Sequence, residues 1–396
     1  MAVLRCALSL GLALCSGGRQ QDNVAQLVRQ GQDSLYRLEY DAAAGIFRRL
    51  IQQHPENPAG YGMLAVVHWN DLLARAGNLA IDDYATPTPF SEGKSGKLDQ
   101  PDVRQAQDRF HQANAQLLEV CEKLLAKNPH DVSALYFQGV YYENLAAEAV
   151  AITRHHTQAI RYGGKAKDIH QQVLALDPDF VDAYVSVASH EYARATLPWS
   201  IKWIAFLLGM RGDKEKALQQ FELVAARGFY RRLDAQVLLA LLDSWRGDPN
   251  QAVTRLRSLR SQYPENYLLD INLAAVMEKK LNNAQAALGI YKELANNRRS
   301  KAWSSCPGEI HFRTGRLLLA LHDDTSALAE FRQAMEVRKA EPETEPLACF
   351  YMARIYEQRN EPERAAESYR RVLRYQGSEL DSELKLARRK AQQISF

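Results

Sequence analysis

The sequence predicts an all-α protein: a solenoid of antiparallel helix pairs that covers residues 24–375. Three observations predict this fold. Small and large apolar residues recur at a fixed spacing, proline and N-capping residues mark the turns, and 396 residues exceed what one compact core usually holds. A solenoid has no such limit, because each repeat buries its apolar face on the next one.

The repeat is clearest near the C-terminus, where Gly315 is followed by Ala327 and Phe331. The same order of residues marks further copies: Gly31-Ala43-Phe47, Gly139-Ala166, Ala217-Phe221, Ala240-Ala252-Leu256, Ala274-Ala286-Ile290 and Ala353-Ala365-Tyr369. Small residues let the two helices of a pair cross closely, and the residue four places later lies on the same helix face and fills the gap. The spacing predicts roughly eight helix pairs.

Proline and capping residues predict where the helices begin and end. Asn57-Pro58, Asn128-Pro129 and Asp177-Pro178 follow second helices, because proline cannot continue a helix. Within pairs, Arg246-Gly247-Asp248-Pro249 and His322-Asp323-Asp324 supply a tight turn and an aspartate N-cap.

This pattern resembles the tetratricopeptide repeat, whose copies are about 34 residues long. The resemblance implies a right-handed superhelical solenoid that binds a protein or peptide on its concave face. The ligand-reading positions of the family are the second, fifth, ninth and twelfth of each copy. In the third and fourth copies these are Ser133, Tyr136, Val140 and Glu143, then Asp182, Val185, Ser189 and Tyr192. Tyr136 is therefore a candidate partner-binding residue. The Lys-Asn clamp of chaperone-binding members does not occur at these positions.

The seventh and eighth copies share an aromatic residue and an arginine at the fifth and ninth positions. The two pairs are Phe312 with Arg316 and Phe350 with Arg354. An aromatic ring and a guanidinium on one face can receive a peptide side chain and a carboxylate, which makes these four residues candidates for partner binding. In the favoured alternative the phenylalanines lie in the core and each arginine pairs with an acidic neighbour, for example Glu357 or Glu309.

Three segments depart from the regular repeat. Residues 79–100 form a long insertion between the two helices of the second copy, and such a loop inside a solenoid is usually functional or disordered. Residues 198–209 predict an extra apolar helix that is either buried or lies on a membrane. The surrounding stretch 197–213 resembles a segment of outer-membrane tetratricopeptide proteins of the inclusion-body-clearance type, which implies closeness to a membrane. Residues 379–396 predict a C-terminal capping helix.

Residues 1–18 differ from the rest of the chain. Arg5 precedes the apolar run Cys6–Cys15, and Ser16-Gly17-Gly18 follows it. This order is typical of a secretory signal peptide, so we expect an exported bacterial protein, located in the periplasm or at the envelope. In the alternative this run is the first solenoid helix, but its apolar residues surround the helix instead of forming one stripe.

Cys15 adds a second interpretation of the N-terminus. Leu12-Ala13-Leu14-Cys15 resembles the lipobox of bacterial lipoproteins, which implies an acylated Cys15, although Leu14 stands where that family has Gly, Ala or Ser. The cysteines beyond it, Cys121, Cys306 and Cys349, are too few and too sparse for a disulfide framework. Cys121 and Cys349 fall at apolar helix positions, so we expect both to be buried.

The sequence predicts no catalytic, metal or cofactor site. His155-His156 and His190-Glu191 lack a second ligand pair at zinc spacing, and Asp82-Asp83 lacks the spaced carboxylates and glycine of a calcium loop. A net charge of +3 gives no reason to expect nucleic acid as a partner. No segment reaches the roughly 18 continuous apolar residues of a membrane-spanning helix.

We therefore expect a non-catalytic scaffold or adaptor at the cell envelope, which holds a protein or peptide on its concave face. Two alternatives remain open. The first is a membrane-associated assembly component, anchored by a lipid on Cys15 or by the apolar helix 198–209, with peripheral membrane contact. The second is an enzyme whose site is formed by the insertion 79–100. The sequence does not predict an oligomeric state.

Overall fold

The computed structural model describes residues 22–76, 100–195, 212–296, 306–337, 344–375, 385–387, 389, 390 and 393. The predicted signal segment, residues 79–99 of the insertion, the apolar segment 198–209 and most of the C-terminal helix lie outside these residues. The chain forms two compact units, and the boundary between Leu239 and Ala240 falls within one helix, α11.

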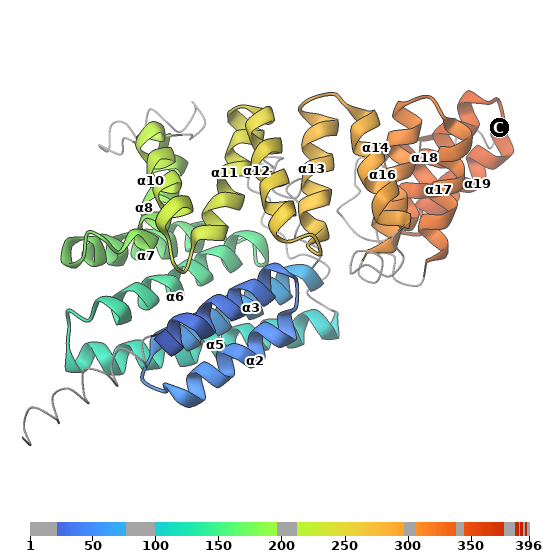
Figure 1. The fold of residues 1–396 in the computed structure, drawn as a ribbon. Coiled ribbons are helices and arrows are strands. Elements are labelled where there is room, and N and C mark those ends of the chain that lie inside the picture. Colours follow the sequence, from blue (N-terminus) through green and yellow to red (C-terminus); the bar gives the residue numbers. More distant parts are fainter. Residues whose placement is uncertain are drawn as a thin grey trace, which may run out of the picture. The chain divides into compact units, whose positions relative to one another are not determined.

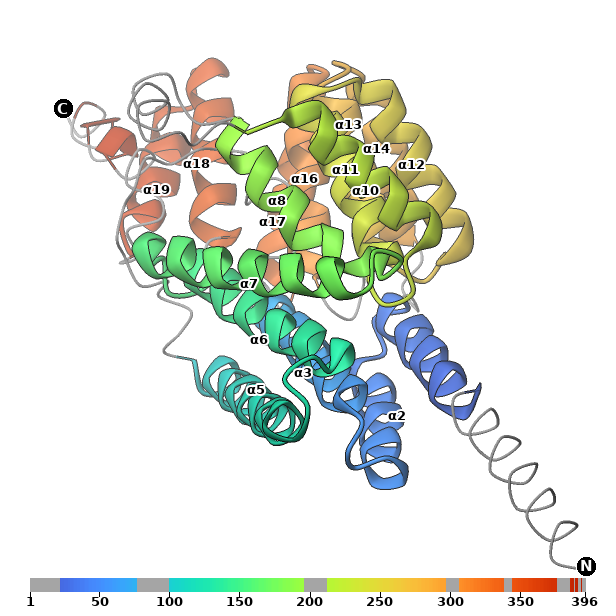
Figure 2. The same ribbon diagram turned by 90° about the vertical axis from the view of Figure 1, so that its left-hand side faces the viewer.

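The first unit consists of helices that pack on their neighbours in chain order. They are residues 22–36, α2 (Tyr40–Gln53), α3 (Pro58–Arg75), α5 (Pro101–Lys127), α6 (Val132–Ala151), α7 (His156–Leu176), the 3-10 turn η2 (Val181–Ala183), α8 (Tyr184–Ala195), α10 (Lys214–Arg227) and the start of α11 (Arg232–Arg246). The long helices α6 and α7 lie side by side (Figures 1 and 2).

The second unit continues the same arrangement. After the end of α11 it contains α12 (Pro249–Gln262), α13 (Tyr267–Lys279), α14 (Ala284–Asn296), α16 (Pro307–Ala320), α17 (Asp324–Glu336), α18 (Thr344–Gln358) and α19 (Pro362–Val372). From α12 to α19 each of these helices contacts the next one in the chain.

The predicted all-helical fold of consecutive helix pairs is confirmed for the described residues, none of which is in a strand. In chain order the pairs are 22–36 with α2, α3 with α5, α6 with α7, α8 with α10, α11 with α12, α13 with α14, α16 with α17, and α18 with α19. No described helix is long and apolar enough to cross a membrane.

The recurring spacing has the physical basis that the sequence indicates. A Cβ atom on Gly31 would lie 2.3 Å from Cζ of Phe47, and one on Gly315 would lie 2.8 Å from Cε1 of Phe331. Both phenylalanines are fully buried. The glycine of each first helix therefore makes room for the aromatic ring of the second helix.

The predicted caps also form. Asn57 accepts a hydrogen bond from the Ala59 N–H at the start of α3, and Asp248 accepts one from Asn250 at the start of α12. The Asp323 side chain accepts a hydrogen bond from the Ser326 N–H at the start of α17. These side chains satisfy N–H groups that the first helical turn leaves without a backbone partner.

The burial of Cys121 and Cys349 agrees with expectation. Cys349 lies in a cluster with Phe350 and Tyr369 of α18 and α19. Ala387 is buried in the same cluster, so the described part of the C-terminal segment covers the end of the last pair.

His68 on α3 is buried in the core, so we expect the stability of the fold to fall at acidic pH. Burial, together with the nearby Arg48 and Arg109, lowers the pKa of His68 to about 4. Because the folded pKa lies below the unfolded value of about 6.5, His68 contributes stability above that pH, and this contribution is lost as the pH falls towards 4. We expect His68→Gln to flatten the fall in melting temperature between pH 6.5 and 4.

Thermal unfolding followed by circular dichroism across this pH range measures the effect. The exposed His130 supplies the matched control, because His130→Gln removes a histidine without removing a buried one. Equal slopes of melting temperature against pH for wild type and His68→Gln would contradict the prediction.

Candidate protein-interaction site

Half of the eight positions that the sequence assigns to ligand reading in the third and fourth copies are buried. Tyr136 and Val140 on α6 are 1% and 2% exposed, and Asp182 and Val185 at the start of the next first helix are also buried. Ser189 remains exposed. The inner face of these copies is therefore not an open groove in the first unit.

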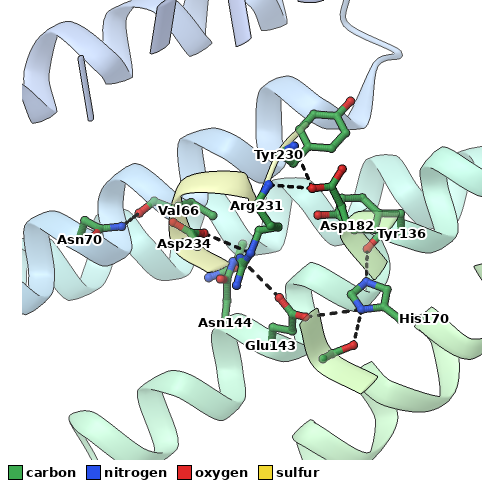
Figure 3. Close-up of polar contacts among 12 residues, drawn as sticks. Val66, Asn70, Tyr136, Glu143, Asn144, His170, Asp182, Tyr230, Arg231 and Asp234 are labelled. Atoms are coloured by element: carbon green, nitrogen blue, oxygen red, sulfur yellow. Dashed lines mark hydrogen bonds and ion pairs between the residues drawn. The ribbon is translucent and has the colours of Figure 1, made fainter. Parts of the chain in front are cut away.

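A segment of the same chain, residues 229–234, covers this face. Asp182 accepts hydrogen bonds from the backbone N–H groups of Phe229 (3.0 Å), Tyr230 (3.1 Å) and Arg231 (2.8 Å). Figure 3 shows Asp182 pointing towards the backbone of this segment. Burial raises the pKa of Asp182, and the three N–H groups oppose that rise. A single carboxylate thus fixes the backbone that enters α11.

The side chain of Arg231 lies among carboxylates on the covered face. Its Nη1 is 3.5 Å from Oε2 of Glu143, and its Nε is 3.1 Å from Oδ2 of Asp234 (Figure 3). These carboxylates raise the pKa of Arg231 against the opposing effect of burial. The guanidinium is the cation that balances the acidic groups of this cluster.

His170 extends the cluster beneath Tyr136. Its Nε2 lies 2.9 Å from the Tyr136 carbonyl oxygen, which only accepts, so Nε2 carries the proton and donates. Its Nδ1 lies 2.5 Å from Oγ of Ser186 and 3.5 Å from Oε1 of Glu143. Burial lowers the pKa of His170, so the ring is neutral and the Ser186 hydroxyl donates to Nδ1. The histidine is a satisfied core residue.

Aromatic rings pack around the same segment. The Tyr230 ring stacks on Tyr136 with centroids 5.5 Å apart and meets Phe137 edge-on at 5.1 Å. Phe180 lies 4.7 Å from Tyr136 by the same measure. Tyr136, which the sequence offers as a partner-binding residue, is thus placed in the core against the chain's own Tyr230.

The helix at residues 22–36 holds the segment from another side. Nε2 of Gln32 donates to the carbonyl oxygens of Phe229 (3.2 Å) and Tyr230 (2.8 Å), and the Tyr36 hydroxyl donates to Asp234. The guanidinium of Arg29 lies 5.6 Å from the centroid of the Phe229 ring. The first copy therefore contacts the start of the fifth, across a separation of 198 residues.

An open groove of about 850 Å³ lies beside this closed face, a size typical of ligand sites. It lies at the N-terminal ends of helix 22–36, α3 and α6. Its lining residues are Val24, Ala25, Gln53, His54, Pro55, Glu56, Asn57, Pro58, Leu124, Asp131, Ser133, Phe229 and Tyr230. Ser133 is one of the predicted ligand-reading positions, and the sequence did not predict a binding role for the other lining residues.

The candidate pairs of the seventh and eighth copies are only partly accessible. The Phe312 ring lies 5.9 Å from that of Phe331, the Phe350 ring lies 6.2 Å from that of Tyr369, and both phenylalanines are buried. Arg316 pairs with Glu278 at 3.2 Å, an acidic neighbour from the preceding copy.

Both phenylalanines are therefore core residues and Arg316 pairs with a carboxylate, as in the favoured alternative. The acidic partner is Glu278, which differs from those expected. Arg354 is exposed on α18. A role of these residues in partner binding stays a prediction. Cys15 lies outside the described residues, and those residues contain no group of three metal-ligating side chains placed to hold an ion.

Comparisons with known proteins agree with the helix pairs. The sequence profile of the tetratricopeptide repeat family matches residues 27–57 and 234–266. No curated protein sequence matches the chain significantly.

The similar solved structures have low identity. They include a thermophilic tetratricopeptide protein of Thermus thermophilus, with 16% identity, 64% of this chain and 99% of that chain covered, and a TM-score of 0.36. A tetratricopeptide repeat protein of Parabacteroides merdae has 12% identity, coverage of 83% and 98%, and a TM-score of 0.33. Human IFIT1, solved with PPP-AAAA, has 14% identity, coverage of 94% and 87%, and a TM-score of 0.44.

The family assignment rests on the profile matches and on the helix pairs. The two matched ranges fall on the first pair, helix 22–36 with α2, and on the fifth pair, α11 with α12. These are the two copies that contact each other through Gln32 and Tyr36. The chain therefore contains tetratricopeptide repeats at residues 27–57 and 234–266, within a longer series of helix pairs.

Proposed function

We propose that this protein is a non-catalytic scaffold that binds an extended segment of a protein partner in the groove beside Phe229 and Tyr230. Tetratricopeptide repeats are protein-interaction modules, and the groove is the observation that carries the location. Since the chain's own residues 229–234 cover Tyr136 and Asp182 on the inner face, a partner cannot bind at these two positions. The groove adjoins this covered region, and Ser133 is one of its lining residues.

Filling the groove is expected to abolish partner capture. Ser133→Trp places a large ring in the groove wall, so we expect a purified partner, identified by co-purification from the native host, to be lost from a pull-down. Ser189→Trp is the matched control, because Ser189 is an exposed inner-face position on α8 outside the groove. Unchanged capture by Ser133→Trp, or loss with Ser189→Trp alone, would place the partner elsewhere.

We also propose that the protein is exported to the cell envelope and that its signal segment is removed. The support is the order of Arg5, the apolar run and the small residues at 16–18. We expect N-terminal sequencing of the mature protein to begin within residues 16–18, and Cys15→Ser to leave its cell fraction unchanged. Release from the membrane fraction by Cys15→Ser would support the lipid-anchored alternative instead.

A membrane anchor at 198–209 and an enzymatic site at 79–100 would each need contacts made by those segments, which lie beyond the described residues. The groove supports the scaffold, because it is an open surface of mixed polar and apolar residues at the ends of three repeats.

A further inference from the structure

We infer that the partner segment carries an apolar residue next to a lysine or arginine. The inference rests on the proposed function and adds the chemistry of the ligand. Its basis is the lining of the groove, which combines a fixed apolar surface with an acidic rim.

Val24, Leu124, Pro55, Pro58, Phe229 and Tyr230 form the apolar part of the groove, and further contacts hold the last two in place. The two aromatic residues are fixed through their backbone, since Asp182 accepts from both N–H groups and Gln32 donates to both carbonyl oxygens. A surface that is already rigid loses little conformational entropy when it receives an apolar side chain.

The rim carries two carboxylates, Glu56 and Asp131, and the described lining residues include no lysine or arginine. Asp131 uses Oδ1 to accept the Ala134 N–H at 2.9 Å as the cap of α6, which fixes its carboxylate at the groove. Glu56 is 80% exposed and lies 3.3 Å from the similarly exposed Lys127. A pair of this kind is weak, so a cation of the partner can replace Lys127.

The same charges argue against an acidic partner segment. A terminal carboxylate or an aspartate-rich peptide would meet Glu56 and Asp131, and juxtaposed like charges disfavour binding. The Lys-Asn clamp that holds such tails in chaperone-binding repeats has no counterpart among the described lining residues. A basic residue beside an apolar anchor satisfies both parts of the groove.

The test uses three pools of fluorescein-labelled octapeptides and the full-length protein. Each pool has a central Leu or Phe, flanked in one by Lys and Arg, in the second by Glu and Asp, and in the third by Ser and Gln. Fluorescence anisotropy at low salt should show the basic pool binding at least about tenfold more tightly than the acidic pool, with the difference shrinking as salt rises.

The double variant Glu56→Gln with Asp131→Asn should reduce the preference for the basic pool to about twofold or less. Asparagine is as good an N-cap as aspartate, so α6 keeps its first turn. The matched control is Glu119→Gln with Glu122→Gln, which removes the same charge from exposed positions of α5 outside the groove and should leave the preference unchanged.

The remaining outcomes separate the inference from the proposed function. Equal binding of all pools, or equal loss in the test and control variants, overturns the basic-apolar chemistry. If Ser133→Trp still abolishes partner capture, the groove remains the site and only its ligand class is wrong. If Ser133→Trp leaves capture unchanged, the proposed site fails as well. A dimer that Ser133→Trp disrupts would identify a second copy of this chain as the occupant and overturn the inference.

Discussion

Replacing Arg231 with alanine is expected to destabilise the first unit by about 3–5 kcal/mol. The substitution removes the cation that lies between Glu143 and Asp234 on the covered inner face, while both carboxylates stay in place. The Arg231 side chain is 20% exposed and that of Glu143 is 16% exposed, so water replaces the lost partner poorly. Urea unfolding followed by circular dichroism measures the change in the free energy of unfolding.

Two further variants test whether the destabilisation comes from the Arg231 ion pairs or from the removal of any arginine. Arg49→Ala alters an exposed arginine on α2 and should change stability by no more than about 0.5 kcal/mol. In the double variant Arg231→Ala with Glu143→Ala, the loss should be smaller than the sum of the single losses, since the uncompensated carboxylate is gone. Additive losses would mean that the two side chains are not coupled.

Two glycine-to-alanine substitutions in helices are expected to act in opposite directions. A Cβ atom on Gly62 of α3 would lie 2.2 Å from Cδ1 of Phe137, a fully buried ring, so Gly62→Ala should destabilise the protein by about 1–3 kcal/mol. Gly163 in the interior of α7 has no atom within 4 Å of such a Cβ. Gly163→Ala should therefore stabilise the protein by about 0.5–1 kcal/mol, because alanine has the higher helix propensity.

The pair of variants is informative because the chemical change is the same. The melting temperature and the urea concentration at the unfolding midpoint should fall for Gly62→Ala and rise for Gly163→Ala. A stabilised Gly62→Ala protein would show that the Phe137 ring shifts at little cost, and that the contact between α3 and α6 is less closely packed than the structure indicates.

The placement of Phe229–Arg231 also bears on how this protein recognises partners. In a regular tetratricopeptide array the inner face receives the ligand. Here the third and fourth copies use Tyr136, Glu143 and Asp182 to hold a segment of the same chain. Recognition is then expected at the ends of the first helices, where the groove lies, and at the exposed Arg354 of the second unit.

The helix pairs, their order and their caps could be predicted from the amino-acid sequence alone. These features follow from local spacing: Gly31 with Phe47 and Gly315 with Phe331 occupy facing positions of two helices joined by a short turn, and Asp323 caps the helix that it precedes. The burial of Cys121 and Cys349 follows from the same periodicity. Because the residues concerned are near one another in the chain, the spacing alone relates them.

The burial of the inner face, in contrast, depends on contacts between segments far apart in the chain. Gln32 and Tyr36 meet residues 229–234 across almost 200 positions of the chain, and no local pattern relates those two segments. The same contact turns Tyr136 from a ligand-reading position into a core residue and leaves the groove at Ser133 open. The contact joins the first and fifth copies, and the spacing within one copy does not specify how successive copies stack.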